Sequence, residues 1–135
     1  YMTHGVVFDL VSQLSLFPQK LKVLGDGTQS KPFVLASDLV RELSRVSEMG
    51  TDTVTKLNFS PKDTMAVREI AELILSESGQ SAKVEFGDSP IGWPGDVNKY
   101  QLSTEKIEGS FGDLHFGSSE NAIRVATRWA LEQFR

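Results

Sequence analysis

The stretch LKVLGDGTQSKPFVLASDLV, residues 21–40, decides the fold prediction because it sets a glycine loop between two apolar segments. Residues 22–24 are expected to form a short strand that ends at Gly-Asp-Gly, residues 25–27, which is a strong turn signal. Residues 33–35 are expected to form a second extended segment. Two interpretations stay open at this point. The loop is either a hairpin turn, or a site whose amides and exposed Lys31 hold an anion.

Around this stretch, apolar residues at helical spacing predict several helices. The helices are expected to begin near Val7, at Ser37 or Asp38, near Asp63 or Thr64, near Thr104, and at Ser118 or Ser119. Gly50 and Gly79 are expected to end the second and third of them. The residues expected to face inward include Leu39, Leu43, Val46, Val67, Ile70, Ala71, Ile74, Ile123, Ala126, Trp129 and Ala130.

Alternating apolar residues predict further strands near residues 55–59 and 82–86, and a long loop follows at residues 87–97. The strands are few and short, whereas the helices are many. The sequence therefore predicts a small α/β domain that is richer in helix than in sheet.

Composition narrows the function classes. The 135 residues suit a single domain, and 14 Lys and Arg against 18 Asp and Glu give a net charge of −4, which argues against a nucleic-acid partner. No apolar run approaches the roughly 18 residues that a membrane span needs. There is no cysteine, so disulfides and thiolate metal sites are excluded. We expect a cytoplasmic domain without a membrane partner.

No catalytic constellation is visible in the sequence. Gly-x-Gly-x-x-Gly, Walker-type and Gly-x-Ser-x-Gly motifs are missing, and neither Tyr1 nor Tyr100 has a lysine four residues later. His4 is expected to cap or pack against a helix, and His115 is expected to be partly buried. We predict no catalytic residue, no metal site and no cofactor-binding residue in this chain.

Four ordered blocks resemble the C-terminal portion of the NAD-dependent epimerase/dehydratase family, the extended short-chain dehydrogenases that act on nucleotide sugars. They are THGVVFDLVSQL, LKVLGDGTQSKPFVLASDLV, LNFSPKDTMAVREIAELI and GWPGDVNKYQLSTEKI. The blocks resemble, in turn, the helix after the family's Rossmann core, its Gly-Asp-Gly segment, its Asn-containing strand with the helix that follows, and its Pro-Gly-Asp loop. Together they cover essentially the whole chain.

The resemblance implies a division of labour. In this family an N-terminal Rossmann domain binds NAD and carries the Tyr-x-x-x-Lys pair. Residues 1–135 are therefore expected to be the C-terminal nucleotide-sugar-binding domain of a larger enzyme, without the Rossmann domain. Its expected partners are a nucleotide sugar, in particular a UDP-sugar, and the Rossmann domain of the same polypeptide, with NAD bound only in the full-length enzyme.

The resemblance also assigns substrate-binding roles. Lys31 stands where the family has an arginine on the diphosphate, and Trp93 stands where many members have a second one. Val23 and Leu24 match the strand whose backbone meets the base, and Asp96 matches the aspartate that accepts from the ribose hydroxyls. Lys22 or Lys99 is a candidate to replace the missing cation.

The expected function is substrate binding in an epimerase of the UDP-glucose 4-epimerase type. A nucleotide-sugar 4,6-dehydratase, decarboxylase or reductase is the alternative within the family. A non-catalytic binding module without a Rossmann partner is the alternative outside it. The upstream reading frame distinguishes these, since the enzyme requires a glycine-rich strand–turn–helix and a Tyr-x-x-x-Lys there.

Overall fold

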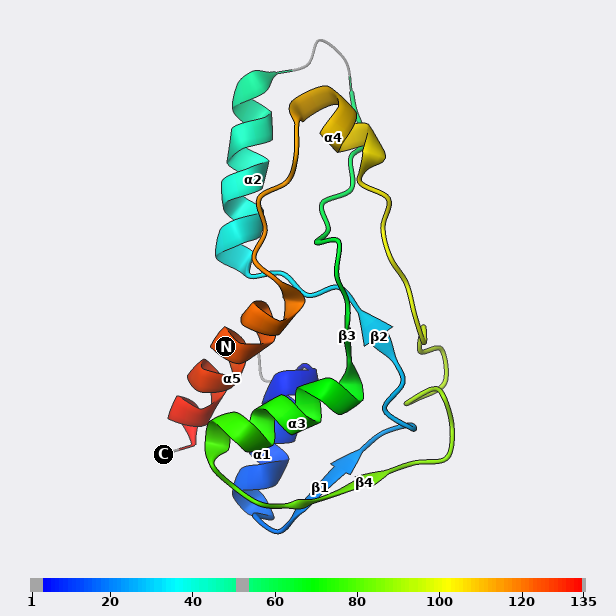
Figure 1. Cartoon of the computed structure of the whole chain (residues 1–135), viewed down its shortest axis with the longest axis vertical. Coiled ribbons are helices and arrows are strands. Elements are labelled where there is room, and N and C mark those ends of the chain that lie inside the picture. Colours follow the sequence, from blue (N-terminus) through cyan, green and yellow to red (C-terminus); the bar gives the residue numbers. More distant parts are fainter. Residues whose placement is uncertain (1–3, 51–53, 135) are drawn as a thin grey trace.

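The computed structural model describes residues 4–50 and 54–134. Its helices are α1 (Val6–Leu16), α2 (Ala36–Met49), α3 (Val67–Ser78), α4 (Glu105–Phe111) and α5 (Ser119–Gln133). Its strands are β1 (Lys20–Val23), β2 (Ser30–Lys31), β3 (Met65–Ala66) and β4 (Lys83–Phe86). The molecule is elongated, with α1, α3, α5, β1 and β4 at one end and α2 and α4 at the other (Figure 1). The predicted helix-rich α/β fold with few short strands is confirmed.

The lower part holds the main core. One face of α1 is buried. It carries Leu10, Val11 and Leu14, which stand at positions i, i+1 and i+4 and so lie on the same side of the helix. They pack with the inner face of α3 and with α5, and β1 contributes buried Leu21 and Val23. β1 pairs in parallel with β4 in the register Leu21↔Val84, so α3 belongs to the crossover between them.

Two short strands lie between the ends of the molecule. β2 pairs antiparallel with β3 through Ser30↔Ala66 and Lys31↔Met65, and Ser30 also bridges Lys99. β1 and β2 are in different sheets, so residues 24–29 do not connect a hairpin. The hairpin interpretation of the glycine loop is therefore wrong.

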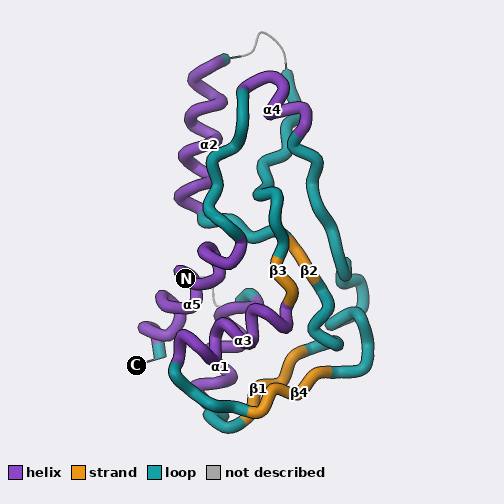
Figure 2. Tube along the Cα trace, viewed as in Figure 1, coloured by secondary structure: helices purple, strands orange, loops and turns teal. Residues whose placement is uncertain are grey.

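The upper part has its own small cluster of buried residues, Val46, Ile107 and Phe111, with Leu57, Phe59 and Leu114 packed against it. Long loop segments connect it to the lower part (Figure 2). Arg45 on α2 donates to the carbonyl of Phe111 at 2.7 Å and forms an ion pair with buried Glu42 at 2.9 Å. This arginine therefore joins α2 to the end of α4.

Several local expectations need correction. Residues 33–35 are not a strand, because the ladder forms at Ser30–Lys31 instead. Residues 54–59 alternate between exposed and half-buried as expected, yet no strand forms there among the described residues, since no neighbouring chain segment supplies a ladder. α2 begins at Ala36, so Ser37 and Asp38 lie inside its first turn rather than at its cap.

Other expectations are confirmed or shifted by a few residues. Gly79 ends α3 in the left-handed conformation at φ 66°, and Ser118 caps α5 by accepting from the Asn121 amide. α3 begins at Val67, a little later than expected. Leu43 and Trp129 are exposed rather than inward-facing, although the Trp129 ring lies near Phe8 of α1, with 6.4 Å between the ring centres.

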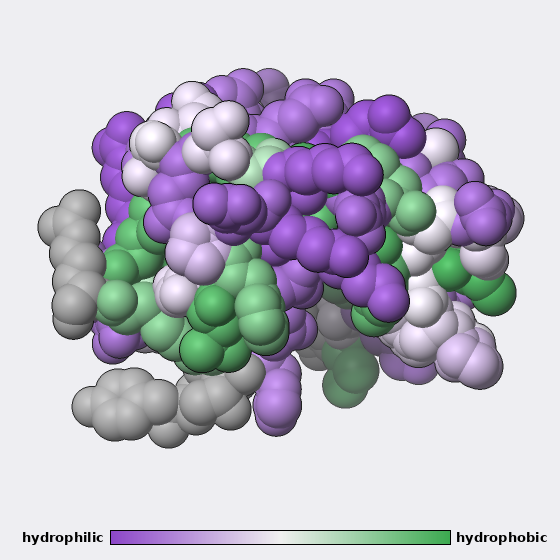
Figure 3. Space-filling view, turned by 90° about the horizontal axis from the view of Figure 1, so that it is seen from below, coloured by the Kyte–Doolittle hydropathy of each residue, from purple (hydrophilic) through white to green (hydrophobic). Residues whose placement is uncertain are grey.

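The surface carries no sign of a bilayer-crossing segment: within residues 4–50 and 54–134, no helix combines the length and apolar character that this requires. Seen from below, hydrophilic side chains cover the middle of the face, and hydrophobic ones form separate patches around them (Figure 3).

Candidate functional site

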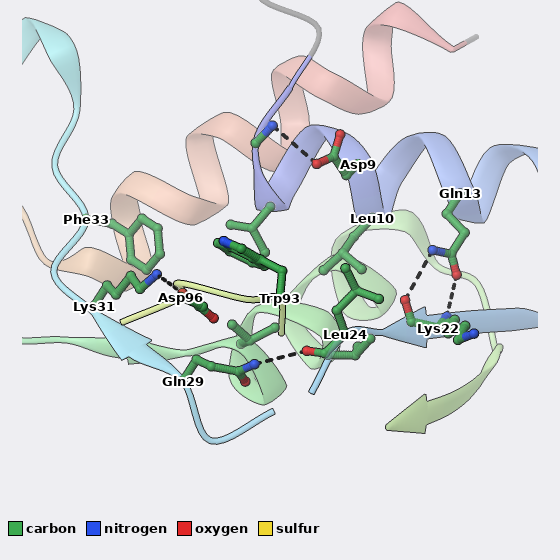
Figure 4. A pocket seen from close by; sticks show the side chains of 14 residues that line it. Asp9, Leu10, Gln13, Lys22, Leu24, Gln29, Lys31, Phe33, Trp93 and Asp96 are labelled. Atoms are coloured by element: carbon green, nitrogen blue, oxygen red, sulfur yellow. Dashed lines mark hydrogen bonds and ion pairs between the residues drawn. The ribbon is translucent and has the colours of Figure 1, made fainter. Parts of the chain in front are cut away.

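A cavity of about 390 Å³ opens between α1, the end of β1 and the loop around Trp93 (Figure 4). All five residues with predicted substrate-binding roles line it, namely Val23, Leu24, Lys31, Trp93 and Asp96. The other lining residues are Gly5, Val6, Asp9, Leu10, Gln13, Lys22, Gln29, Phe33 and Val67. The walls are mainly apolar, and the charged groups are two carboxylates and two ammonium groups.

An ion pair joins the two loops of the cavity. The Lys31 ammonium lies 2.8 Å from Asp96 Oδ1, although the residues are far apart in sequence. The Asp96 side chain is only 1% exposed and the Lys31 side chain 27% exposed, so Lys31 is not the exposed loop lysine that the sequence suggests. The Gly92 amide donates to the other carboxylate oxygen at 3.2 Å.

These contacts set the charge state of Asp96. The hydrogen bond from Lys31, and then the Gly92 amide, hold the pKa of the Asp96 carboxyl below its ordinary value of 3.8, against the opposing effect of burial. Asp96 is therefore ionised at neutral pH. Because the Lys31 ammonium carries three donors, two of them remain after the bond to Asp96.

Trp93 stands beside this ion pair. The Lys31 ammonium lies 5.4 Å from the centre of the indole ring, which is within the range of a cation–π contact. Trp93 is 55% exposed and lines the cavity. In Figure 4 it lies between Lys31 on one side and Leu10 and Leu24 on the other.

The edge of β1 that faces α1 is already occupied. The side-chain carboxamide of Gln13 accepts from the Lys22 amide and donates to the Lys22 carbonyl at 3.2 Å (Figure 4). On its other edge, Val23 pairs with Phe86 of β4. The resemblance assigns the base to the backbone of Val23 and Leu24, where the Leu24 carbonyl already accepts from Gln29 Nε2 at 3.1 Å.

The glycine loop has a structural role. Gly25 and Gly27 have φ values of 77° and 80°, and a Cβ at Gly27 would come within 2.6 Å of the Phe86 ring. The Asp26 amide donates to the Ser89 carbonyl at 2.7 Å, and the Thr28 amide donates to the Asp26 carboxylate at 2.8 Å. These amides are not free for an anion, and residues 25–28 do not line the cavity. From the end of the loop, Gln29 and Lys31 reach the cavity.

Gln29 is the buried polar residue of the cavity wall, with 3% of its surface exposed. Its Nε2 donates to the Leu24 carbonyl at 3.1 Å, while its buried Oε1 has no partner among the described residues. If the Gln29 carboxamide were turned round, Oε1 would face the Leu24 carbonyl oxygen, and two acceptors would meet. The hydrogen bond to Leu24 therefore fixes the orientation of the carboxamide. The acceptor Oε1 is therefore the atom that lacks a donor.

Sequence reasoning did not single out Gln13 and Gln29. Gln29 directly follows the glycine turn, and its amide occupies the space that a side chain at Gly25 would need, only 2.1 Å from such a Cβ. Gln13 gave no signal, because its contact with β1 depends on tertiary packing. Of the two lysines considered as replacement cations, Lys22 lines the cavity and Lys99 does not.

The two histidines lie outside this cavity, and both are exposed. The expected partial burial of His115 is wrong, because residues 112–118 form an irregular surface segment whose apolar neighbours cover it incompletely. Among the described residues, no group of three or more His, Asp or Glu side chains is placed to hold a metal ion.

Two curated proteins match the chain in sequence, and both are dTDP-sugar reductases. No protein-family model matches the chain. It is similar to a dTDP-4-dehydro-6-deoxy-D-allose reductase of a Streptomyces species, with 26% identity over 105 residues, 77% of this chain and 32% of the relative. The enzyme of the same name from Streptomyces bikiniensis is 24% identical over 105 residues. The chain thus spans about a third of the length of these curated relatives, 32% in each case.

Solved structures share the fold across nearly the whole chain. A UDP-galactose 4-epimerase matches with a TM-score of 0.79 and 21% identity, covering 98% of this chain and 42% of that one. The UDP-glucuronic acid 4-epimerase of Bacillus cereus, in complex with UDP-glucuronic acid and NAD, matches with a TM-score of 0.76 and 20% identity, covering 97% and 41%. The fold is thus that of a part of nucleotide-sugar epimerases, and the sequence similarity to dTDP-sugar reductases agrees with the resemblance seen in the sequence.

Proposed function

We propose that residues 1–135 are the substrate-binding domain of an NAD-dependent enzyme that modifies a nucleotide sugar, and that the cavity at Trp93 binds the nucleotide. The observation that carries the proposal is the convergence of Val23, Leu24, Lys31, Trp93 and Asp96 on one cavity. These residues come from segments far apart in the sequence. The roles that the resemblance assigns to them require that they lie together.

In this proposal each polar group has a distinct task. Lys31 keeps its bond to Asp96 and gives its remaining donors to the diphosphate, and Lys22 supplies the second positive charge of the cavity. The arginine that the family uses can bind a phosphate in a planar bidentate way. A lysine ammonium cannot, so the contact with the phosphate has no fixed bidentate geometry. Asp96 orients Lys31 and accepts from a ribose hydroxyl.

NAD belongs to another part of the enzyme. The chain has neither Gly-x-Gly-x-x-Gly nor Tyr-x-x-x-Lys, so its residues do not fit the dinucleotide or the hydride chemistry. We assign both to a Rossmann domain of the same polypeptide. An apolar groove between α1, residues 33–36 and α5 supports such a partner, because it includes Val7, Phe8 and exposed Trp129.

Two reaction types have support. The solved structures include 4-epimerases, which favours the epimerase of the sequence prediction. Both curated sequence relatives are dTDP-sugar reductases, which favours reduction. The epimerase and the reductase would differ in the domain that holds NAD, so the nucleotide site proposed for this chain serves either reaction.

Calorimetric titration with UDP-glucose and dTDP-glucose tests the proposal. Wild-type protein is expected to bind at least one of them. Lys31→Met, which keeps the aliphatic stem, should weaken binding by about 1.5–3 kcal/mol, the range for a hydrogen bond to a charged group. Lys106→Met on α4, an exposed lysine that does not line the cavity, is the matched control. Absence of binding to both nucleotides by folded wild-type protein would refute the proposal.

A further inference from the structure

Trp93 is the most exposed large aromatic residue of the cavity wall. The indole is half exposed and lines the cavity, so part of its flat, polarisable surface is open to a ligand. Its contact with Lys31 uses the ring on the side of the ion pair, and Leu10 and Leu24 line the cavity on the other side in Figure 4. Such a surface suits a flat ring.

The apolar wall argues against a sugar ring at this position. A sugar presents hydroxyls in all directions, and each would need a polar partner when buried. The apolar lining residues of the cavity include Val6, Leu10, Leu24 and Phe33. A nucleobase instead has two apolar faces and confines its hydrogen-bonding groups to its edge.

The polar groups of the wall fit the edge of a base. Gln29 lines the same cavity, and its buried Oε1 atom lacks a donor among the described residues. A pyrimidine imide supplies one N–H donor. On β1, the Lys22 backbone is bonded to Gln13, and the Leu24 carbonyl is bonded to Gln29.

Building on the proposed nucleotide site, we infer that Trp93 is a stacking platform for the nucleobase. The pyrimidine lies against the indole face that looks toward Leu10 and Leu24. The base thereby gains contact area from a residue of the 87–97 loop.

Indole fluorescence tests this inference directly, because the chain has only two tryptophans. Trp129→Phe removes the other one, which lies on α5 and does not line the cavity, so the remaining emission reports Trp93. Uridine and UDP should quench this emission, with excitation where uracil does not absorb. Glucose 1-phosphate should leave it unchanged.

Affinity provides a second measurement. Calorimetry should show that Trp93→Ala loses about tenfold or more in UDP affinity, as removal of a base-stacking aromatic does, whereas Trp93→Phe stays close to wild type. Circular dichroism confirms that each variant is folded, and Trp93→Phe preserves a test if Trp93→Ala does not fold.

The outcomes separate this inference from the proposed function. If UDP binds but leaves Trp93 emission unchanged, or if Trp93→Ala binds UDP as wild type does, the stacking role is overturned while the nucleotide site stands. Quenching by glucose 1-phosphate and not by uridine would place a sugar at Trp93 and also overturn it. Failure of wild-type protein to bind any of the nucleotides would refute the proposed function itself.

Discussion

Removing the charge of Lys31 should destabilise the fold, because it leaves the Asp96 carboxylate buried. Asp96 is 1% exposed and pairs with Lys31 at 2.8 Å. Loss of one partner of a fully buried pair costs about 3–5 kcal/mol. Here Asp96 keeps the Gly92 amide at 3.2 Å, and Lys31 is partly exposed. We therefore expect Lys31→Met to lower the free energy of unfolding by about 1–3 kcal/mol, the cost of an unsatisfied buried acceptor.

A double-mutant cycle measures the coupling. Asp96→Asn removes the negative charge, so adding Lys31→Met in that background should change stability by no more than about 0.5 kcal/mol. Urea denaturation of the wild type, both single variants and the double variant gives the four free energies. If Lys31→Met is neutral, or if the two changes add without coupling, the buried-pair argument fails.

The same pair sets a pH dependence. The folded pKa of Asp96 lies below its ordinary value of 3.8, chiefly through Lys31. Its stabilisation is therefore present above the unfolded pKa and is lost as the pH falls through the folded pKa. Lys31→Met should flatten the loss of stability in this acidic range. A profile that parallels wild type would contradict this reasoning.

The remaining predictions concern the scaffold. Gly27→Ala forces a side chain into φ 80° against the Phe86 ring and should cost about 1–3 kcal/mol, measured by thermal denaturation. Gly109→Ala, in the open middle of α4, should instead stabilise by about 0.5–1 kcal/mol, and equal melting temperatures for the two variants would contradict the steric argument. The hydrogen bond from Arg128 holds the folded pKa of Glu77 below its ordinary value of 4.5. Glu77→Gln should therefore weaken the pH dependence of stability below that value. A melting temperature that varies with pH as in the wild type would exclude this.

Local patterns in the sequence predicted the parts of the fold that local physics controls. The spacing of Leu10, Val11 and Leu14 marks the buried face of α1, and Gly79 marks the left-handed end of α3. The alternation near residues 82–86 became β4. In each case the signal and the structure lie within one or two turns of chain.

Pairing between distant segments was not predictable in this way. The sequence did not show that β1 pairs in parallel with β4, nor that β2 belongs to another sheet. It suggested binding roles for Lys31 and Asp96 through the family resemblance, yet their mutual ion pair depends on tertiary structure. Trp129 was expected to be buried because periodicity marks an apolar face without showing whether this chain covers it.

The residues of the cavity wall occupy a small share of the chain: they come from residues 5–33, 67 and 93–96, and none comes from α2, α4 or α5. Evolution can therefore alter the length and sequence of the α2–α4 end without changing the chemistry presented to a ligand. In the proposed function, ligand choice therefore depends on the few positions around Lys31 and Trp93 rather than on identity averaged over the chain.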